Sequence, residues 1–308
     1  MSTAPAAVPG PLSRWVAGAR PRTLPAAAVP VVVGTAVGWW LRSGAPGGGR
    51  LVAGPEEVIW WRAGLALVVA LALQVGTNYA NDYSDGVRGT DRGRVGPLRL
   101  VASGSATPES VRRAALACFG VAGAAGLALA ASTTWWLVPV GAACVVAGWL
   151  YTGGPRPYGY LGLGEAFVFL FFGVVATVGS AYVQRQAFGL WWVCVPVGLL
   201  STALLEANNL RDVAGDAAAG KRTLAVRVGP RRARWLYVGS LAGVVAGIAG
   251  AAVVRPWALV ALGALPLALR PSRAVLDGAS GRELLAVLAR TGQLQLAVGA
   301  LLALGIVL

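Results

Sequence analysis

Two clusters of aspartate and asparagine carry most of the chemistry that this sequence can perform. The first covers residues 81–85, with Asp91 six positions after Asp85. The second covers residues 208–212 and is followed by Asp216. The chain has 12 acidic residues in 308, so these clusters hold much of its negative charge. Each cluster follows directly after a long apolar run. Carboxylates placed in this way, twice, predict a divalent-metal site at the edge of a membrane.

The spacing within the clusters favours shared faces. Asp82 and Asp85 are three residues apart, and Asp212 and Asp216 are four apart, so each pair shares one face of a helix end. Crowded carboxylates repel one another unless they are protonated or bind a cation. The chain has no histidine, which excludes histidine-based acid–base catalysis and histidine metal ligands. Oxygen ligands alone favour a hard ion, and Mg²⁺ is the expected cofactor.

The residues around the aspartates suit a phosphorylated ligand. A single Asp-x-x-Asp is usually an exposed loop or helix cap, but two such clusters flanked by amides and arginines indicate a metal–diphosphate site. The expected phosphate-binding cations are Arg94, Arg99, Arg211, Lys221 and Arg222. The amides expected to add neutral ligands or to hold the carboxylates are Asn78, Asn81, Asn208 and Asn209.

The composition is that of an all-α, polytopic membrane protein. The hydrophobic fraction is 56%, the charged fraction is 12% and the mean hydropathy is +0.66. The three cysteines lie in apolar runs and are expected to be buried thiols. We expect one transmembrane domain over residues 1–308, with residues 1–13 as a disordered tail, and about nine helices. Their expected ranges are 23–41, 60–80, 112–131, 134–151, 162–183, 188–209, 232–254, 256–270 and 283–307.

The distribution of positive charge predicts the orientation. The net charge is +14, and 20 of the 26 Lys and Arg residues fall in loops on one side of the predicted spans. By the positive-inside rule, this side, with the N-terminus and two Asp-rich loops, is cytoplasmic, in a plasma membrane. The same charge suits contact with anionic membrane lipids and not nucleic acid. Thirteen of those basic residues lie in the two aspartate-bearing loops, more than orientation alone requires.

A polar metal site above a wide apolar body suits a ligand with a diphosphate head and a hydrocarbon tail. A metal ion can offset the charge on a departing diphosphate, which leaves an allylic cation for a nucleophile to capture. Aromatic faces can stabilise such a cation. Five tyrosines lie near the predicted cytoplasmic boundary, where each is equally well explained as an interfacial residue. They are Tyr79, Tyr83, Tyr151, Tyr158 and Tyr160.

These motifs make the chain resemble the UbiA superfamily of intramembrane prenyltransferases over about residues 14–308. The similar stretches are residues 19–25, 78–91, 96–99, 151–155 with 162–165, and, most specifically, 208–225. A strict superfamily pattern would place the third aspartate of the first motif at Gly89. The longer gap from Asp85 to Asp91 is typical of the family branch that acts on a naphthoate.

The resemblance implies a helical bundle of that family's type and assigns roles. Asp82, Asp85, Asp212 and Asp216 would be catalytic and, with Asn81 and Asp91, would bind Mg²⁺ and diphosphate. Arg22, Arg94, Arg99, Lys221 and Arg222 would hold phosphate or an acceptor's carboxylate. Tyr151, Glu165 and Glu206 are candidates for the acceptor site. The implied reaction joins a polyprenyl group from polyprenyl diphosphate to 1,4-dihydroxy-2-naphthoate, with loss of CO₂ and diphosphate, and gives demethylmenaquinone.

Two alternative functions remain open, and a third is excluded by its sequence pattern. A different aromatic acceptor is the main alternative. A membrane cation transporter is less favoured, because its carboxylates should lie at mid-span depth and these lie at span ends. CDP-alcohol phosphotransfer also uses several aspartates at a membrane surface. Its Asp-Gly-x-x-Ala-Arg pattern fails here, because Gly89 and Thr90 follow Arg88.

Overall fold

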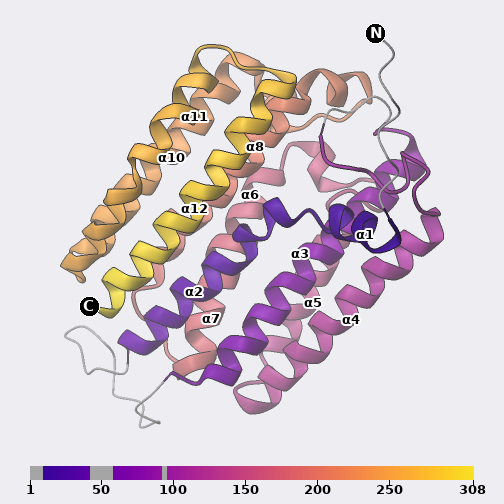
Figure 1. Cartoon of the computed structure of the whole chain (residues 1–308). Helices are drawn as coiled ribbons and strands as arrows, with labels where there is room; N and C mark the ends of the chain where they lie inside the picture. Colours follow the sequence, from indigo (N-terminus) through magenta and orange to yellow (C-terminus); the bar gives the residue numbers. More distant parts are fainter. Residues whose placement is uncertain (1–9, 42–57, 92–95) are drawn as a thin grey trace.

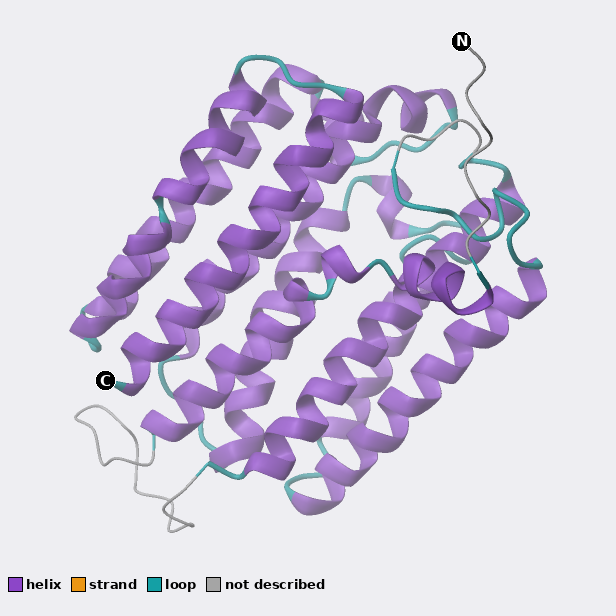
Figure 2. Ribbon diagram, in the orientation of Figure 1, coloured by secondary structure: helices purple, strands orange, loops and turns teal. Residues whose placement is uncertain are grey.

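The protein is a bundle of helices, seen in a computed structural model that describes residues 10–41, 58–91 and 96–308. These parts of the chain contain helices and loops and no strand (Figures 1 and 2). The all-α class predicted from composition is therefore confirmed. The phosphate-binding candidate Arg94 lies outside the described residues, as do residues 42–57 between the first two expected helices.

Six helical segments of the described residues are long and apolar enough to cross a bilayer, which makes this a multi-pass membrane protein. Five such helices are α3 (Trp60–Arg88), α4 (Pro108–Ser132), α8 (Cys194–Ala218), α10 (Pro230–Ala252) and α12 (Leu284–Val307). A sixth span, Gly164–Arg185, joins α6 (Gly164–Val168), the π-helix η3 (Phe169–Val175) and α7 (Ala176–Arg185).

The remaining spans are bent or short, so the predicted count of nine is not confirmed. The segments Leu12–Thr23 and Pro25–Trp40 meet at 53°, and Pro256–Ala264 meets Pro266–Leu276 at 51°. Counting each bent pair as one span raises the six to eight, and α5 (Leu137–Leu150) is a shorter apolar helix. The bends follow from proline, which ends one helix and opens the next at Pro25 and Pro266.

The aspartate clusters lie on helices, which corrects the prediction of two Asp-rich loops. We expected helices ending near residues 80 and 209, but α3 continues to Arg88 and α8 to Ala218. Gly89, with a φ of 71°, ends α3 in the left-handed region that glycine adopts readily. The polar side chains of these last turns, such as Asp85 and Asp212, form hydrogen bonds and ion pairs with other side chains.

The N-terminal part of the chain lies across the bundle rather than along it. Helix α1 (Pro11–Ala19) packs against α3, and a short 3₁₀ turn, η1 (Pro21–Thr23), leads into α2 (Pro25–Trp40) (Figure 1). The expected tail of residues 1–13 falls mostly outside the described residues, but its last positions already belong to α1. Leu12 and Val16 on α1 are exposed, as in a helix that lies at a membrane surface.

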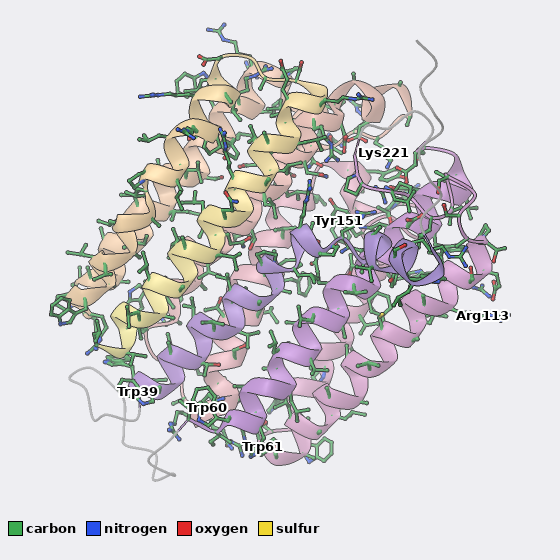
Figure 3. The ribbon with its side chains drawn as sticks, in the orientation of Figure 1. Trp39, Trp60, Trp61, Arg113, Tyr151 and Lys221 are labelled. Atoms are coloured by element: carbon green, nitrogen blue, oxygen red, sulfur yellow. The ribbon has the colours of Figure 1, made fainter. Side chains whose placement is uncertain are left out.

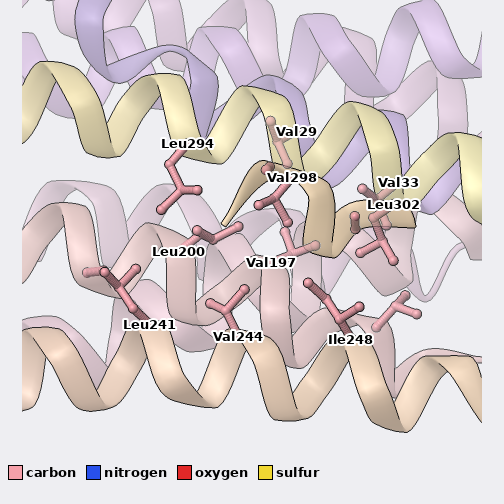
Figure 4. Packing of buried hydrophobic residues seen from close by; sticks show 14 of the residues in the cluster. Val29, Val33, Val197, Leu200, Leu241, Val244, Ile248, Leu294, Val298 and Leu302 are labelled. Carbon is pink, nitrogen blue, oxygen red and sulfur yellow. The ribbon is translucent and has the colours of Figure 1, made fainter. Parts of the chain in front are cut away.

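The largest core lies among α2, α8, α10 and α12 and contains mainly valine, leucine and alanine (Figure 4). Helices approach closely where glycine faces a neighbour. A Cβ atom on Gly34 of α2 would lie 2.3 Å from the carbonyl oxygen of Thr177 on α7. Small residues at such contacts are the usual means by which membrane helices pack. This packing fixes the helices that carry the polar site.

Candidate active site

The ends of α3 and α8 meet through Asp85. Its carboxylate accepts a hydrogen bond of 2.6 Å from the Tyr160 hydroxyl and lies 2.9 Å from Nζ of Lys221, just beyond α8. Arg99 approaches the same carboxylate at 3.9 Å. The two sequence clusters, more than a hundred residues apart, are therefore one site. Lys221 and Tyr151 lie toward the end of the bundle opposite Trp60 and Trp61 (Figure 3).

Asp82, although only three residues away, has a different environment. It is fully buried, and its two carboxylate oxygens accept hydrogen bonds from the backbone N–H groups of Leu100 (2.8 Å) and Val101 (3.0 Å). It does not line the cavity described below. Asp91 likewise pairs with Arg99, at 3.2 Å. These two aspartates hold the segment that carries Arg99 beside Asp85.

On α8, Asp212 forms a two-pronged ion pair with its neighbour Arg211, at 2.8 and 2.6 Å. Asn208, Asn209 and Asp216 lie on the cavity side of the same helix, and Asp212 does not line the cavity. The amide of Asn209 donates a hydrogen bond of 2.9 Å to the buried carboxylate of Glu165. The two helices thus present amide and carboxylate oxygens to a common space.

That space is a cavity of about 410 Å³ between the helices, within the usual range for one small-molecule ligand. Its wall is mainly apolar, and its charged and amide groups gather near the end where α3 and α8 meet. The predicted site residues that line it are Arg22, Asn78, Asn81, Asp85, Arg99, Tyr151, Asn208, Asn209, Arg211, Asp216 and Lys221. An anionic head with an apolar tail fits this distribution of groups.

The oxygen ligands in this cavity fit a hard divalent cation. Asn81 and Asp85 are four residues apart on α3 and line the cavity, as does Asp216 on α8. Lys221 places a positive charge on Asp85, where a bound cation would also lie. Among the described residues no three carboxylates converge on one point. A metal ion here would therefore depend on Asp85 and Asp216, amide oxygens and ligand phosphates.

Some predicted ligands are occupied in other ways. The Asn78 amide donates to the carbonyl of Ala19 (2.9 Å) and to the Thr23 hydroxyl (3.2 Å), so it anchors the turn that carries Arg22. The backbone N–H of Arg222 donates to the carbonyl of Tyr160 (3.0 Å), and Arg222 does not line the cavity. Both residues position parts of the site.

Two polar residues that line the cavity, Arg20 and Gln74, were not predicted from the sequence, and neither was the contact of Tyr160 with Asp85. Gln74 could have been found, because it continues the polar stripe of α3 one turn before Asn78. Arg20 gives no comparable signal, since its place depends on the turn after α1. It has a φ of 55°, a rare conformation for a residue other than glycine.

Tyr160 is placed to serve as a neutral hydrogen-bond donor. Burial raises the pKa of its phenol, and the adjacent Asp85 carboxylate raises it further. The ammonium of Lys221 also lies 4.8 Å from the centre of its ring. The hydroxyl therefore stays protonated and directs its proton at Asp85.

A ladder of aromatic rings lines one wall of the cavity. Tyr151 meets Tyr158 edge-on at 5.4 Å, Tyr158 stacks on Phe167 at 4.1 Å, and Phe167 lies 6.0 Å from Phe171. Such ring faces can stabilise a developing carbocation in an apolar space. The other acceptor-site candidates, Glu165 and Glu206, are buried but do not line the cavity.

Fold and site together define a membrane-embedded enzyme for a ligand with an anionic head and an apolar tail. Residues 44–287 match the UbiA prenyltransferase family, and the chain belongs to this family. The chain is 51% identical over 286 residues to a Mycobacterium tuberculosis 1,4-dihydroxy-2-naphthoate octaprenyltransferase, covering 91% of this chain and 92% of that relative. It is 39% identical over 240 residues to the Escherichia coli protein of the same name, covering 74% and 73%.

Solved structures share the fold. A UbiA homolog from Archaeoglobus fulgidus, described as bound to GPP and Mg²⁺, superposes with a TM-score of 0.62 at 16% identity, covering 94% of this chain and 99% of that one. The apo structure of a UbiA homolog from Aeropyrum pernix K1 also gives 0.62 at 16% identity, covering 91% and 96%. The UbiA-type helical bundle expected from the sequence is thereby confirmed.

Proposed function

We propose that the protein transfers a polyprenyl group from polyprenyl diphosphate to 1,4-dihydroxy-2-naphthoate, releasing diphosphate and CO₂ and giving demethylmenaquinone in its quinol form, which air oxidises to the quinone on extraction. The observation that carries this proposal is the single cavity in which a cationic, amide-rich end adjoins a long apolar wall. The names of the M. tuberculosis and E. coli relatives support the naphthoate acceptor. The positive-inside distribution supports a plasma-membrane location with this polar end facing the cytoplasm.

The donor's diphosphate would lie between α3 and α8. Lys221, Arg99 and Arg211 all line the cavity and would supply positive charge to it, as hydrogen-bonded cations commonly do for phosphate. Asp85, Asp216 and the Asn81 amide are the residues we expect to hold Mg²⁺. When bound, the ion would offset the charge that develops on the leaving diphosphate. Asp82, Asp91 and Asp212 would act indirectly, by fixing the elements around this set.

The chemical step breaks the bond between the first prenyl carbon and the diphosphate oxygen. The electron pair of that bond leaves with the diphosphate, and an allylic cation faces the ladder of Tyr151, Tyr158 and Phe167. The ring carbon that carries the carboxylate then forms the new carbon–carbon bond. Loss of that carboxylate as CO₂ returns an electron pair to the ring, restores its aromaticity and leaves the 1,4-quinol.

The proposal is tested in membranes that contain the protein. The membranes are mixed with ring-labelled 1,4-dihydroxy-2-naphthoate and a polyprenyl diphosphate, with Mg²⁺ or with EDTA, and the lipids are extracted. We expect a labelled lipid quinone with Mg²⁺ only. Transfer to another aromatic acceptor, but not to the naphthoate, would assign a different acceptor. Transfer to none would contradict prenyl transfer and favour the transporter reading.

A further inference from the structure

Glu165, in the first turn of α6, is a buried carboxylate that the proposed reaction does not use. It is 8% exposed and does not line the cavity. One of its oxygens accepts the hydrogen bond of 2.9 Å from the Asn209 amide, and among the described residues its other oxygen has no hydrogen-bond partner. Helix α6 packs against α8 (Figure 1), but packing alone does not require a buried charge, which is costly. The contact with Asn209 is therefore what this carboxylate provides.

Asn209 connects this carboxylate to the cavity. Its side chain is buried, and it lines the cavity. Because a carboxylate oxygen accepts hydrogen bonds, Glu165 holds the nitrogen of the amide and leaves the amide oxygen for the cavity. Within residues 10–41, 58–91 and 96–308, no donor reaches this oxygen. A buried acceptor without a donor is unfavourable, so this geometry favours a ligand that supplies one.

The position of Asn209 along α8 separates it from the expected metal ion. Asn209 precedes Asp216 by seven residues, which is about 10 Å along a helix. An oxygen ligand lies about 2 Å from Mg²⁺, so an ion held at Asp85 and Asp216 is beyond the reach of Asn209. Asn209 lies instead near the aromatic ladder, because a Cβ atom on Gly164, at the start of α6, would lie 3.4 Å from the Tyr151 hydroxyl. The amide oxygen thus faces the part of the cavity where the new bond would form.

The two substrates of the proposed reaction differ in the hydrogen bonds that they can donate. An ionised diphosphate has acceptor oxygens only, and a prenyl chain is apolar, so the prenyl donor supplies no hydrogen to an amide oxygen. A dihydroxynaphthoate has two hydroxyl groups, and each can donate. The acceptor is therefore the substrate whose chemistry fits this oxygen.

We propose that Asn209 accepts a hydrogen bond from a hydroxyl of the aromatic acceptor, and that Glu165 is a positioning residue that keeps the amide oxygen turned to that hydroxyl. This inference rests on the proposed function, because it concerns recognition of the acceptor at the same site. The hydrogen bond would hold the acceptor ring beside Tyr151. The carboxylate polarises the amide, so the bond to the hydroxyl would also raise the electron density of the attacking ring.

The test compares 1,4-dihydroxy-2-naphthoate with the two analogues that each lack one hydroxyl, 1-hydroxy-2-naphthoate and 4-hydroxy-2-naphthoate. Their fluorescence is titrated with the whole protein in detergent, in the presence of Mg²⁺ and a non-reactive prenyl thiodiphosphate. We expect the unaltered protein to bind one analogue about tenfold more weakly than the dihydroxy ligand. In Asn209→Leu this difference should disappear. Equal binding of all three ligands by the unaltered protein, or a difference that persists in Asn209→Leu, would overturn the inference.

The role of Glu165 is tested through its dependence on Asn209. Glu165→Leu should weaken binding of the dihydroxy ligand about tenfold, whereas Glu165→Gln should largely retain it, because the glutamine oxygen can still accept from the Asn209 amide. When Asn209 is already leucine, Glu165→Leu should cause no further loss of affinity. Losses that add in the double variant would show that Glu165 does not act through Asn209.

The matched control is Ser240→Ala. It removes the hydrogen bond of 3.1 Å to the buried carboxylate of Glu206, and neither residue lines the cavity. Affinity for the dihydroxy ligand should be unchanged, and a loss as large as in Glu165→Leu would overturn the specific role of Glu165. If the unaltered protein binds none of the naphthoates, the proposed acceptor fails together with this inference. Transfer to the naphthoate with the same ligand preference in Asn209→Leu would overturn the inference alone.

Discussion

The Nζ atom of Lys221 lies 2.9 Å from the carboxylate of Asp85, and this ion pair joins the end of α8 to the end of α3. Both groups are buried. A buried carboxylate with a buried ammonium is stable as a pair, and removing either partner leaves the other charge uncompensated. Both residues line the cavity. A ligand that brings a cation and an anion could therefore replace the ion pair, with the cation on Asp85 and the anion on Lys221.

Asp85 and Asp82 should respond differently to the same substitution. Asp85→Asn removes a cavity-lining charge, so we expect at least a hundredfold loss of turnover, and a loss of stability as well because the buried Lys221 loses its partner. Asp82→Asn replaces one of two acceptors for backbone N–H groups with a donor, so it should cost about 1–3 kcal/mol of stability. Turnover and the melting temperature in detergent are measured for both. A hundredfold loss of turnover in Asp82→Asn at an unchanged melting temperature, or full turnover in Asp85→Asn, would contradict these separate roles.

Lys221→Met should weaken donor binding. We expect the KM for the prenyl diphosphate to rise about tenfold or more, because a cation beside phosphate contributes a charge-assisted hydrogen bond. Lys221→Arg retains the charge and should recover part of the loss. The measurement is steady-state kinetics with varied donor, and a KM unchanged by Lys221→Met would remove this residue from the phosphate site.

Tyr160→Phe keeps the ring beside Lys221 and deletes the hydroxyl, which donates to Asp85 at 2.6 Å and lies 3.4 Å from the Thr90 hydroxyl. We expect kcat/KM to fall about tenfold. Because the pKa of the Tyr160 phenol is raised, its neutral form persists above the usual tyrosine range. The loss should therefore be the same from about pH 7 to about pH 9. A defect that disappears at the upper end of this range would show that the phenol ionises there.

Close helix packing predicts the effect of a change far from the site. Gly34→Ala would place a Cβ atom 2.3 Å from the Thr177 carbonyl oxygen and should separate α2 from α7, at a cost of about 1–3 kcal/mol. Gly64→Ala on α3 meets nothing within 4 Å and is the matched control. Thermal unfolding in detergent distinguishes the two, and equal melting temperatures would contradict the packing described for α2 and α7.

Much of the fold could be predicted because apolar runs of about 20 residues have few alternatives to membrane helices. The positions at which the helices end were predicted less accurately. Residues 81–88 are polar, and their sequence predicts a loop. They remain helical because Asp82 accepts hydrogen bonds from the backbone of residues 100–101, and because Asp85 pairs with Tyr160 and Lys221. These partners are distant in sequence, and local patterns carry no information about them.

The same limit applied to the site. Both clusters could be located from the sequence. Asp82 and Asp85 were assigned the same role, because a spacing of three residues places them on one broad face of a helix. Which side of that face meets the cavity depends on how α3 rotates against its neighbours. Asn81 and Asp85 are turned to the cavity, and Asp82 to the segment after α3. Tyr160 is similar, because its position depends on a backbone contact with Arg222.

We infer that α3 and α8 jointly hold one metal-bound diphosphate. An experimental structure with Mn²⁺ in place of Mg²⁺ and a non-reactive prenyl thiodiphosphate tests it most directly. We predict anomalous density for the metal within coordination distance of Asp85 and Asp216, with Lys221 moved from Asp85 to a phosphate oxygen. Metal density at Asp82 instead, or a Lys221 still paired with Asp85 beside the bound ligand, would contradict the account.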